Sequence, residues 1–160
     1  MAVEIERKFL VKGNEWRSLG TGTLYRQGYI TTHNGTTVRV RLAGSQGYLT
    51  FKGKSVGFSR AEYEYPIPAQ DAQEMLDNLC DRPLIEKTRY KIDLAGVIWE
   101  VDEFWGENEG LIIAEVEIKD ENQRVDLPDW IEQEVSNDSK YYNVHLFKHP
   151  FQQWSQEEKY

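Results

Sequence analysis

Four pairs of acidic residues in this sequence are spaced two positions apart, which places both side chains of a pair on one face of a β-strand. The acidic pairs are Glu4/Glu6, Glu62/Glu64, Glu100/Asp102 and Glu115/Glu117. Carboxylate oxygens that point the same way can share a hard cation such as Mg²⁺ or Mn²⁺, because these ions take oxygen ligands. The spacing therefore favours a divalent metal site.

Basic residues follow the same spacing on other segments. The basic set is Lys8, Arg39/Arg41, Lys52/Lys54 and Lys87/Arg89/Lys91. Arginines on one strand face can grip phosphate oxygens through paired N–H donors, and lysines add compact positive charges. A surface that carries both the acidic and the basic set would suit a polyphosphate bound together with a metal ion.

These residues lie in segments whose polar and apolar residues alternate, which predicts β-strands. The predicted strands cover residues 3–11, 24–32, 37–42, 48–54, 59–67, 84–94, 97–104 and 111–119. Residues 69–80 change to a helical period, and short helices are predicted around 130–134 and 141–147. Short turns between the strands favour an antiparallel sheet, and eight such strands can close into a barrel.

A simpler interpretation fits each strand taken alone. A half-exposed antiparallel sheet also has one apolar and one polar face, and for any single strand this is the favoured reading. Two details count against the half-exposed sheet when all the charged strands are considered together. Solvent-facing sides of strands usually also contain Thr, Ser and Gln. Like charges two positions apart on a strand repel each other unless an ion of opposite charge binds between them. Periodicity does not say which face points inward.

Bulk properties narrow the class of protein. The 160 residues fit one domain over residues 1–150 with a polar tail over 151–160. Cys80 is the only cysteine, which excludes an internal disulfide and fits a reducing cytoplasm. The net charge of −8 argues against nucleic-acid binding, and the absence of a long apolar run argues against a membrane span. A small polyanion in a locally basic pocket stays compatible with this charge.

The order of the charged pairs resembles a known family. Glu4, Glu6 and Lys8 match the ExExK signature of the CYTH superfamily, the triphosphate tunnel metalloenzymes. The other pairs follow in the order of the family, and residues 134–143 are similar to its closing EVTxDxRYxN stretch. The resemblance covers residues 3–147 and fits the short, single-domain prokaryotic type.

The resemblance implies a mainly β fold, a closed eight-stranded antiparallel barrel that forms a hydrophilic tunnel, with a few peripheral helices. The charged faces would point into the tunnel. It also implies hydrolysis of inorganic triphosphate to pyrophosphate and phosphate with Mg²⁺ or Mn²⁺. The expected partner is the small triphosphate substrate, without nucleic acid or membrane, and a homodimer is an assembly that the family allows.

The resemblance also implies roles for individual residues. The implied metal ligands are Glu4, Glu6, Asp102, Glu115 and Glu117, with Glu62 and Glu64 serving a second metal or holding a basic neighbour. The implied phosphate-binding residues are Lys8, Arg39, Arg41, Lys52, Lys54, Arg89 and Lys140. Lys140 stands where the family pattern more often has arginine, and lysine lacks the bidentate fork of that side chain.

Two routes for activating the attacking water stay open. One uses a metal-bound water positioned by a glutamate. The other uses Lys87 as base, since neighbouring arginines lower the pKa of a lysine, and Tyr29 could pair with it on the inward face. A plain phosphate contact for Lys87 and ordinary packing for Tyr29 are the simpler alternatives.

Other functions also stay open at this point. The same tunnel could serve a nucleoside or thiamine triphosphatase, or an adenylate cyclase of the class IV kind. A polyphosphate-binding module without catalysis would need fewer carboxylates than this chain has. A lipocalin-like barrel with a polar exterior would instead have an apolar interior.

Overall fold

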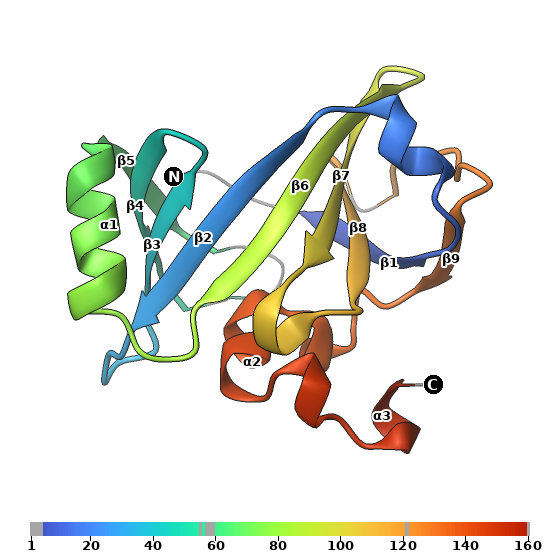
Figure 1. The fold of residues 1–160 in the computed structure, drawn as a ribbon. Coiled ribbons are helices and arrows are strands. Elements are labelled where there is room, and N and C mark those ends of the chain that lie inside the picture. Colours follow the sequence, from blue (N-terminus) through green and yellow to red (C-terminus); the bar gives the residue numbers. More distant parts are fainter. Residues whose placement is uncertain (1–4, 55, 57–59, 121, 160) are drawn as a thin grey trace.

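The computed structural model describes residues 5–54, 56, 60–120 and 122–159 (Figure 1). Nine strands form one antiparallel sheet in the order β5-β4-β3-β2-β6-β7-β8-β1-β9. The strands are β1 (Glu6–Val11), β2 (Gly22–Ile30), β3 (Thr37–Ala43), β4 (Gln46–Lys52), β5 (Glu62–Ile67), β6 (Ile85–Leu94), β7 (Val97–Phe104), β8 (Ile112–Glu117) and β9 (Ile131–Glu134). The antiparallel, mainly β prediction is confirmed.

The helices are short and peripheral. They are the α-helices α1 (Ala69–Asn78), α2 (Asn143–Lys148) and α3 (Gln156–Lys159) and the 3₁₀ helices η1 (Glu15–Leu19), η2 (Gly106–Asn108), η3 (Ser139–Tyr141) and η4 (Phe151–Gln153). Within the described part of the chain, no helix has the length and apolar character needed to cross a bilayer.

The prediction of a closed eight-stranded barrel is wrong in two respects. The sheet has nine strands, and its outer strands β5 and β9 are not joined to each other. β9 pairs with β1 on the edge that faces away from β8, so this edge is no longer available to close the sheet. At the other edge, β5 contains Pro66, whose nitrogen has no hydrogen to donate to a further strand.

The segment around residues 130–134 is a strand rather than the predicted helix. Val11 lies opposite Ile131 and Phe9 lies opposite Glu134 in the pairing of β1 with β9. Ile131 and the preceding Trp130 are buried in the core next to Phe9. Burial against β1 overrides the weak helical pattern of this four-residue segment, since tertiary packing commonly outweighs local propensity.

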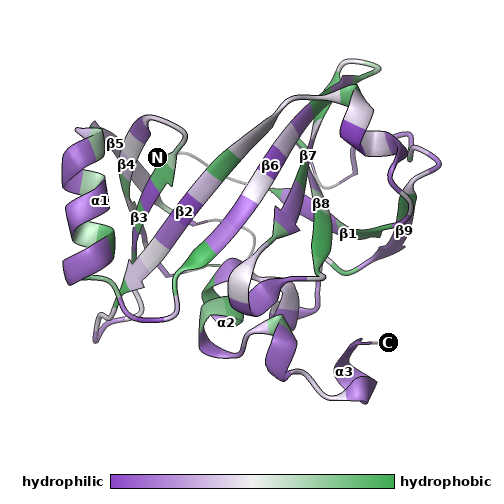
Figure 2. Ribbon diagram, viewed as in Figure 1, coloured by the Kyte–Doolittle hydropathy of each residue, from purple (hydrophilic) through white to green (hydrophobic). Residues whose placement is uncertain are grey.

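Alternation along the strands sorts the side chains onto two faces. Hydrophilic and hydrophobic residues alternate along β3, and the helix α1 turns an apolar side toward it (Figure 2). Val40 of β3 packs with Ala72 and Leu76 of α1, which confirms the predicted helix. The helix ends at Asn78, so Leu79 is exposed and the buried position that follows is Cys80.

Two further apolar clusters hold the rest of the sheet. One packs Trp16 of η1 against the side of β6 to β8 that carries Trp99. The other packs Leu146 of α2 and Trp154 against Phe104 and Ile113 at the ends of β7 and β8. The first of these clusters covers the outside of the sheet. The second lies on the charged face, because Phe104 and Ile113 are two positions from Asp102 and Glu115 on the same strands, and it packs next to the charged residues at the α2 end of the sheet.

Candidate active site

A cavity of about 460 Å³ lies against the charged face of the curved sheet. Each strand from β1 to β8 contributes at least one side chain to its wall, and the segment that leads into α2 adds Tyr142 and Asn143. The volume is within the range of small-molecule sites, roughly 300–1,000 Å³. The strand alternation therefore delivers charged side chains to one cavity, although the sheet is open.

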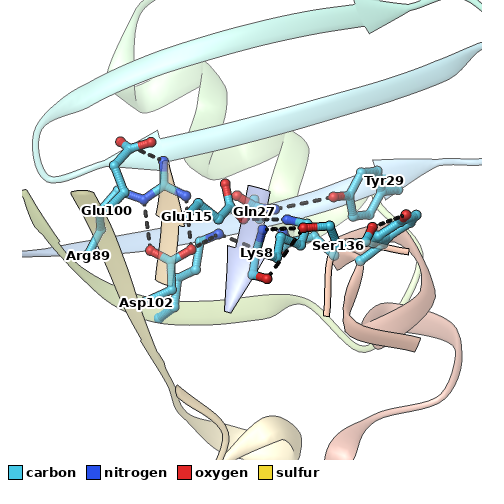
Figure 3. Close-up of polar contacts among 11 residues, drawn as sticks. Lys8, Gln27, Tyr29, Arg89, Glu100, Asp102, Glu115 and Ser136 are labelled. Atoms are coloured by element: carbon cyan, nitrogen blue, oxygen red, sulfur yellow. Dashed lines mark hydrogen bonds and ion pairs between the residues drawn. The ribbon is translucent and has the colours of Figure 1, made fainter. Parts of the chain in front are cut away.

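Carboxylates gather on the wall formed by β1, β7 and β8. The strand register places Glu115 beside both Lys8 and Glu100, and it places Glu6 beside Glu117. Lys8 Nζ donates to Glu115 Oε1 at 2.5 Å (Figure 3). Burial by itself would lower the pKa of Lys8, but the charges of Glu115, Glu6 and Asp102 outweigh burial and raise it. Lys8 is thus a permanent cation among carboxylates.

A buried ion network extends from Arg89 at the cavity wall to residues beneath the wall. Asp102 accepts two hydrogen bonds from Arg89, at 2.8 and 2.9 Å, and its Oδ2 lies 2.8 Å from Lys87 Nζ. Lys87 Nζ also donates to Asn143 Oδ1 at 3.2 Å and lies over the ring of Phe104. One carboxylate therefore serves two cations, as Figure 3 shows for Arg89.

The pKa of Lys87 is lowered to about 7, first by complete burial and then by the charges of Arg89 and Arg41. Asp102 opposes this shift without cancelling it, because its charge is shared with Arg89. Burial would raise the pKa of Asp102, but the two cations hold it below its usual value. Lys87 can thus exchange a proton near neutral pH, while Asp102 stays ionised.

The opposite wall, formed by β3, β4 and β5, is mainly basic. Arg39 Nη2 lies 3.4 Å from Glu64 Oε1, and Lys52 Nζ lies 3.7 Å from Glu62 Oε1. The predicted alternative in which Glu62 and Glu64 hold basic neighbours therefore matches these contacts. The buried Nε of Arg39 has no hydrogen-bond partner among the described residues.

Two cavity-lining arginines on this side lack a carboxylate partner within the described ranges. Arg41 Nε donates to Gln27 Oε1 at 2.9 Å, and burial together with Arg39 and Arg89 lowers the pKa of Arg41 to about 10. Arg60 donates from Nε to Gly53 O at 2.8 Å and from Nη2 to Thr37 Oγ1 at 2.7 Å. Both guanidinium groups are held in place by neutral acceptors and present uncompensated positive charge.

The family model for the CYTH domain matches residues 2–145 of this chain, which is nearly its whole length. The chain belongs to the CYTH family. An inorganic triphosphatase of Acetivibrio thermocellus is 53% identical over 98% of this chain and 100% of its own length. An inorganic triphosphatase of Nitrosomonas europaea is 38% identical over 89% of this chain and 95% of its own.

A solved structure of an inorganic triphosphatase has the same fold as this CYTH domain. It is 32% identical, the match covers 92% of this chain and 95% of that one, and the TM-score is 0.66. The family resemblance found in the charged pairs is thereby confirmed. The similarity extends over both walls of the cavity, since the family match includes every strand from β1 to β9.

Most of the predicted site residues come together in the CYTH domain. The predicted residues that line the cavity are Glu6, Lys8, Tyr29, Arg39, Arg41, Lys52, Glu62, Glu64, Arg89 and Glu115. Asp102 and Lys87 lie directly beneath it, in contact with Arg89 and Asn143 respectively. Glu4 lies outside the described residues, so its place is not part of this geometry.

Three predicted residues lie away from the cavity wall. Glu117 is exposed at the end of β8, next to the strand position of Glu6. Lys54 is exposed and its side chain lies against Gly35 in the turn before β3. Lys140 Nζ lies over the rings of Tyr141 and Trp154 and 3.5 Å from Asp138 Oδ2.

The structure adds cavity residues that the sequence reasoning missed. Arg60 has an acidic residue two positions later, so a search for like-charged pairs passes over it. Tyr142 and Asn143 belong to the closing segment of the family pattern, which was the available signal for them. Tyr142 donates from its hydroxyl to Ser136 O at 2.7 Å, and this bond fixes the loop at the cavity wall.

The carboxylates of this site fit a hard divalent metal in donor type. Glu6, Glu100 and Glu115 line the same side of the cavity and offer only oxygen. Among the residues that the structure describes, however, no three acidic, histidine or cysteine side chains already form a metal-binding group. Glu115 Oε1 is instead occupied by Lys8. The chemistry fits Mg²⁺ or Mn²⁺, provided that the ammonium group of Lys8 moves.

Proposed function

We propose that this CYTH domain hydrolyses inorganic triphosphate to pyrophosphate and phosphate with the help of Mg²⁺ or Mn²⁺. The observation that carries the proposal is the uncompensated charge of Arg41 and Arg60 beside the unsatisfied Nε of Arg39. Buried cations and buried donors are costly unless an anion or an acceptor meets them. A polyphosphate would meet all three, and two relatives named inorganic triphosphatase support this choice of polyanion.

The basic wall would bind and orient the phosphate chain. Arg39, Arg41 and Arg60 supply planar donors, and Lys52 and Lys8 supply ammonium groups at the two sides of the cavity. Most of the catalysis of phosphoryl transfer is positioning and charge stabilisation, so these contacts account for much of the expected rate. Lys54 and Lys140 stay predictions, because neither lines the cavity.

The acidic wall would hold the metal. Glu6 and Glu115 are the central ligands in this proposal, and Glu4, Glu117 and Asp102 complete the predicted set. A bound divalent ion would neutralise charge on the phosphate oxygens and favour departure of the leaving group. Arg89 holds Asp102 in place and also contacts Glu100 at 3.3 Å, so it links the buried carboxylate to one that lines the cavity.

Lys87 and Tyr29 are the groups of this chain that we assign to proton handling. Near neutral pH a fraction of Lys87 is the free amine, which would accept a proton from the attacking water once its side chain extends past Asn143 into the cavity. Tyr29 lines the cavity, and burial raises the pKa of its phenol, so it stays protonated and can donate a hydrogen bond. Gln27 Nε2 donates to the Tyr29 hydroxyl at 3.2 Å and thereby orients it.

The test is phosphate release from inorganic triphosphate, ATP, thiamine triphosphate and pyrophosphate, with Mg²⁺, Mn²⁺ or EDTA. We expect metal-dependent release that favours inorganic triphosphate. Equal rates on ATP would point to a nucleoside triphosphatase, cyclic AMP formation would point to a cyclase, and binding without turnover would point to a binding module. Each of these three results contradicts the proposed function.

A pair of variants tests whether the uncompensated charge of Arg41 contributes to turnover. Arg41→Gln removes the uncompensated charge and should lower kcat/KM by about 100-fold or more, as for loss of a donor to a transferring group. Arg26→Gln is the matched control, because Arg26 is the adjacent basic residue on β2 and bonds to Gln73 of α1 outside the cavity. Equal losses in both variants would mean that fold stability rather than phosphate binding is affected.

The cellular setting is also a prediction. The single buried Cys80 fits a reducing cytoplasm. A homodimer stays a prediction from the family resemblance, and sedimentation of the purified chain would check it.

A further inference from the structure

The ammonium group of Lys8 lies among the carboxylates that the proposed function assigns to the metal. Its Nζ is 2.5 Å from Glu115 Oε1, and the two side chains are only 12% and 8% exposed. Glu6 and Asp102 also act on Lys8 with their negative charge. The pair is therefore shielded from water, and its attraction is stronger than that of a surface ion pair.

We propose that Lys8 is an internal competitor of the metal: it holds Glu115 in the empty enzyme, and triphosphate draws it away so that substrate and metal bind cooperatively. This inference rests on the proposed function, because it uses the same cavity and the same carboxylates.

Competition follows from the charges at Glu115. A divalent cation bound there would stand close to an ammonium group, and like charges at short range in a partly buried site repel strongly. The ammonium group must move before the metal can use both oxygens of Glu115.

Triphosphate would offer Lys8 an anion other than the carboxylates of the acidic wall. Lys8 lines the cavity, and its Nζ lies 5.8 Å from the centre of the Tyr142 ring, on the side from which Asn143 also faces the cavity. Phosphate oxygens in the cavity would accept from the ammonium group and offset the loss of Glu115. Triphosphate would thus tighten metal binding, and by linkage the metal would tighten triphosphate binding to the same degree.

Lys52 supplies the matched comparison within the same cavity. It also lines the wall and also faces a glutamate, Glu62, at 3.7 Å, but it stands on β4, on the opposite side from Glu115. Loss of Lys52 removes one positive charge from the cavity and leaves the Lys8–Glu115 pair in place. It therefore separates direct competition from a general change in cavity charge.

The experiment is a titration of metal-free protein with Mn²⁺, followed by calorimetry and by electron paramagnetic resonance, without any phosphate compound. We expect Lys8→Gln to bind Mn²⁺ at least about 10-fold more tightly than wild type, and Lys52→Gln to change affinity by less than about 3-fold. Lys8→Gln affinity equal to or weaker than wild type overturns the inference, and so does an equal gain in both variants.

A second titration measures the coupling. With non-hydrolysable imidotriphosphate bound, the gain in Mn²⁺ affinity should be at least about 10-fold smaller in Lys8→Gln than in wild type. An equal gain in both proteins contradicts the inference. Lys8→Met replaces Lys8→Gln if the latter fails to fold, as judged by circular dichroism. Parallel turnover assays on wild type separate the two proposals, since failure of these titrations leaves hydrolysis of triphosphate untouched.

Discussion

Lys87 and Asn143 are joined by a hydrogen bond of 3.2 Å although 56 positions separate them in the chain. The bond links the middle of the sheet to the first residue of α2. Asn143 lines the cavity, while Lys87 lies beneath it and is completely buried. The start of α2 therefore sets the direction in which the amine of Lys87 points.

Removal of this contact should impair turnover more than binding. Asn143→Ala leaves Lys87 with Asp102 as its main acceptor and should lower kcat by about 10-fold, with KM changed by less than about 2-fold, as for a lost positioning contact. Steady-state kinetics on inorganic triphosphate measure the split. Asn137→Ala is the control, because Asn137 is exposed in the same segment. A rise in KM at constant kcat would assign Asn143 to substrate binding instead.

Lys87 should also change how the free energy of unfolding depends on pH. Its pKa is about 7 in the folded chain and near its ordinary value of 10.5 when unfolded. Between these values the unfolded chain binds more protons, so the free energy of unfolding rises with pH in this window. Urea unfolding of wild type and Lys87→Met at several pH values from 6 to 10 would show a steeper rise in wild type. Parallel curves would mean that Lys87 is protonated in the folded chain.

Cys80 should react slowly, because it is buried just after the C-terminal end of α1. Burial raises the pKa of its thiol to about 11 from a model-peptide value of 9.0, which leaves about 100-fold less thiolate at pH 8. Alkylation with iodoacetamide should therefore be at least about 100-fold slower in the native protein than in urea. Mass spectrometry over time follows the reaction. Comparable rates in the two conditions would show that Cys80 is accessible and activated.

A larger residue at Gly47 should destabilise the fold, because α1 and the last residue of β5 approach this position closely. A Cβ at this position would lie 2.8 Å from Ile67 O and 2.9 Å from the Cβ of Ala72. Gly47→Ala should lower the free energy of unfolding by about 1–3 kcal/mol, as expected for overpacking. Gly53→Ala is the control, since its nearest neighbour would be Ala61 at 3.5 Å, and it should change stability by less than about 0.5 kcal/mol.

The sequence predicted the strands well where burial alternates with charge over several residues. β3 and β7 lie within a residue of their predicted bounds, because Val40 and Trp99 face the core while Arg39 and Glu100 face the cavity. β9 was not predicted as a strand because four residues are too few to establish a period. Closure of the sheet depends on which edges pair, and a list of strands contains no information about pairing.

The strand pattern also could not predict which site residues line the cavity and which lie beneath it. Asp102 and Arg89 were predicted as ligands of different partners, yet they bond to each other beneath the wall. Strand alternation gives the face of a residue but not how far its side chain extends. Lys140 lies in a short 3₁₀ helix, where the aromatic rings of Tyr141 and Trp154 decide its direction.

The unjoined edges of the sheet give bound substrate a mechanical role. The basic wall belongs to β3, β4 and β5 and the acidic wall to β1, β7 and β8, and backbone pairing links the two groups only through β2 and β6. A metal–triphosphate complex would tie both walls together from within, as a backbone ladder does in a closed barrel. Bound metal and triphosphate would therefore limit twisting of the sheet between the two walls. Proteases should cleave the empty protein more readily than the protein with substrate bound.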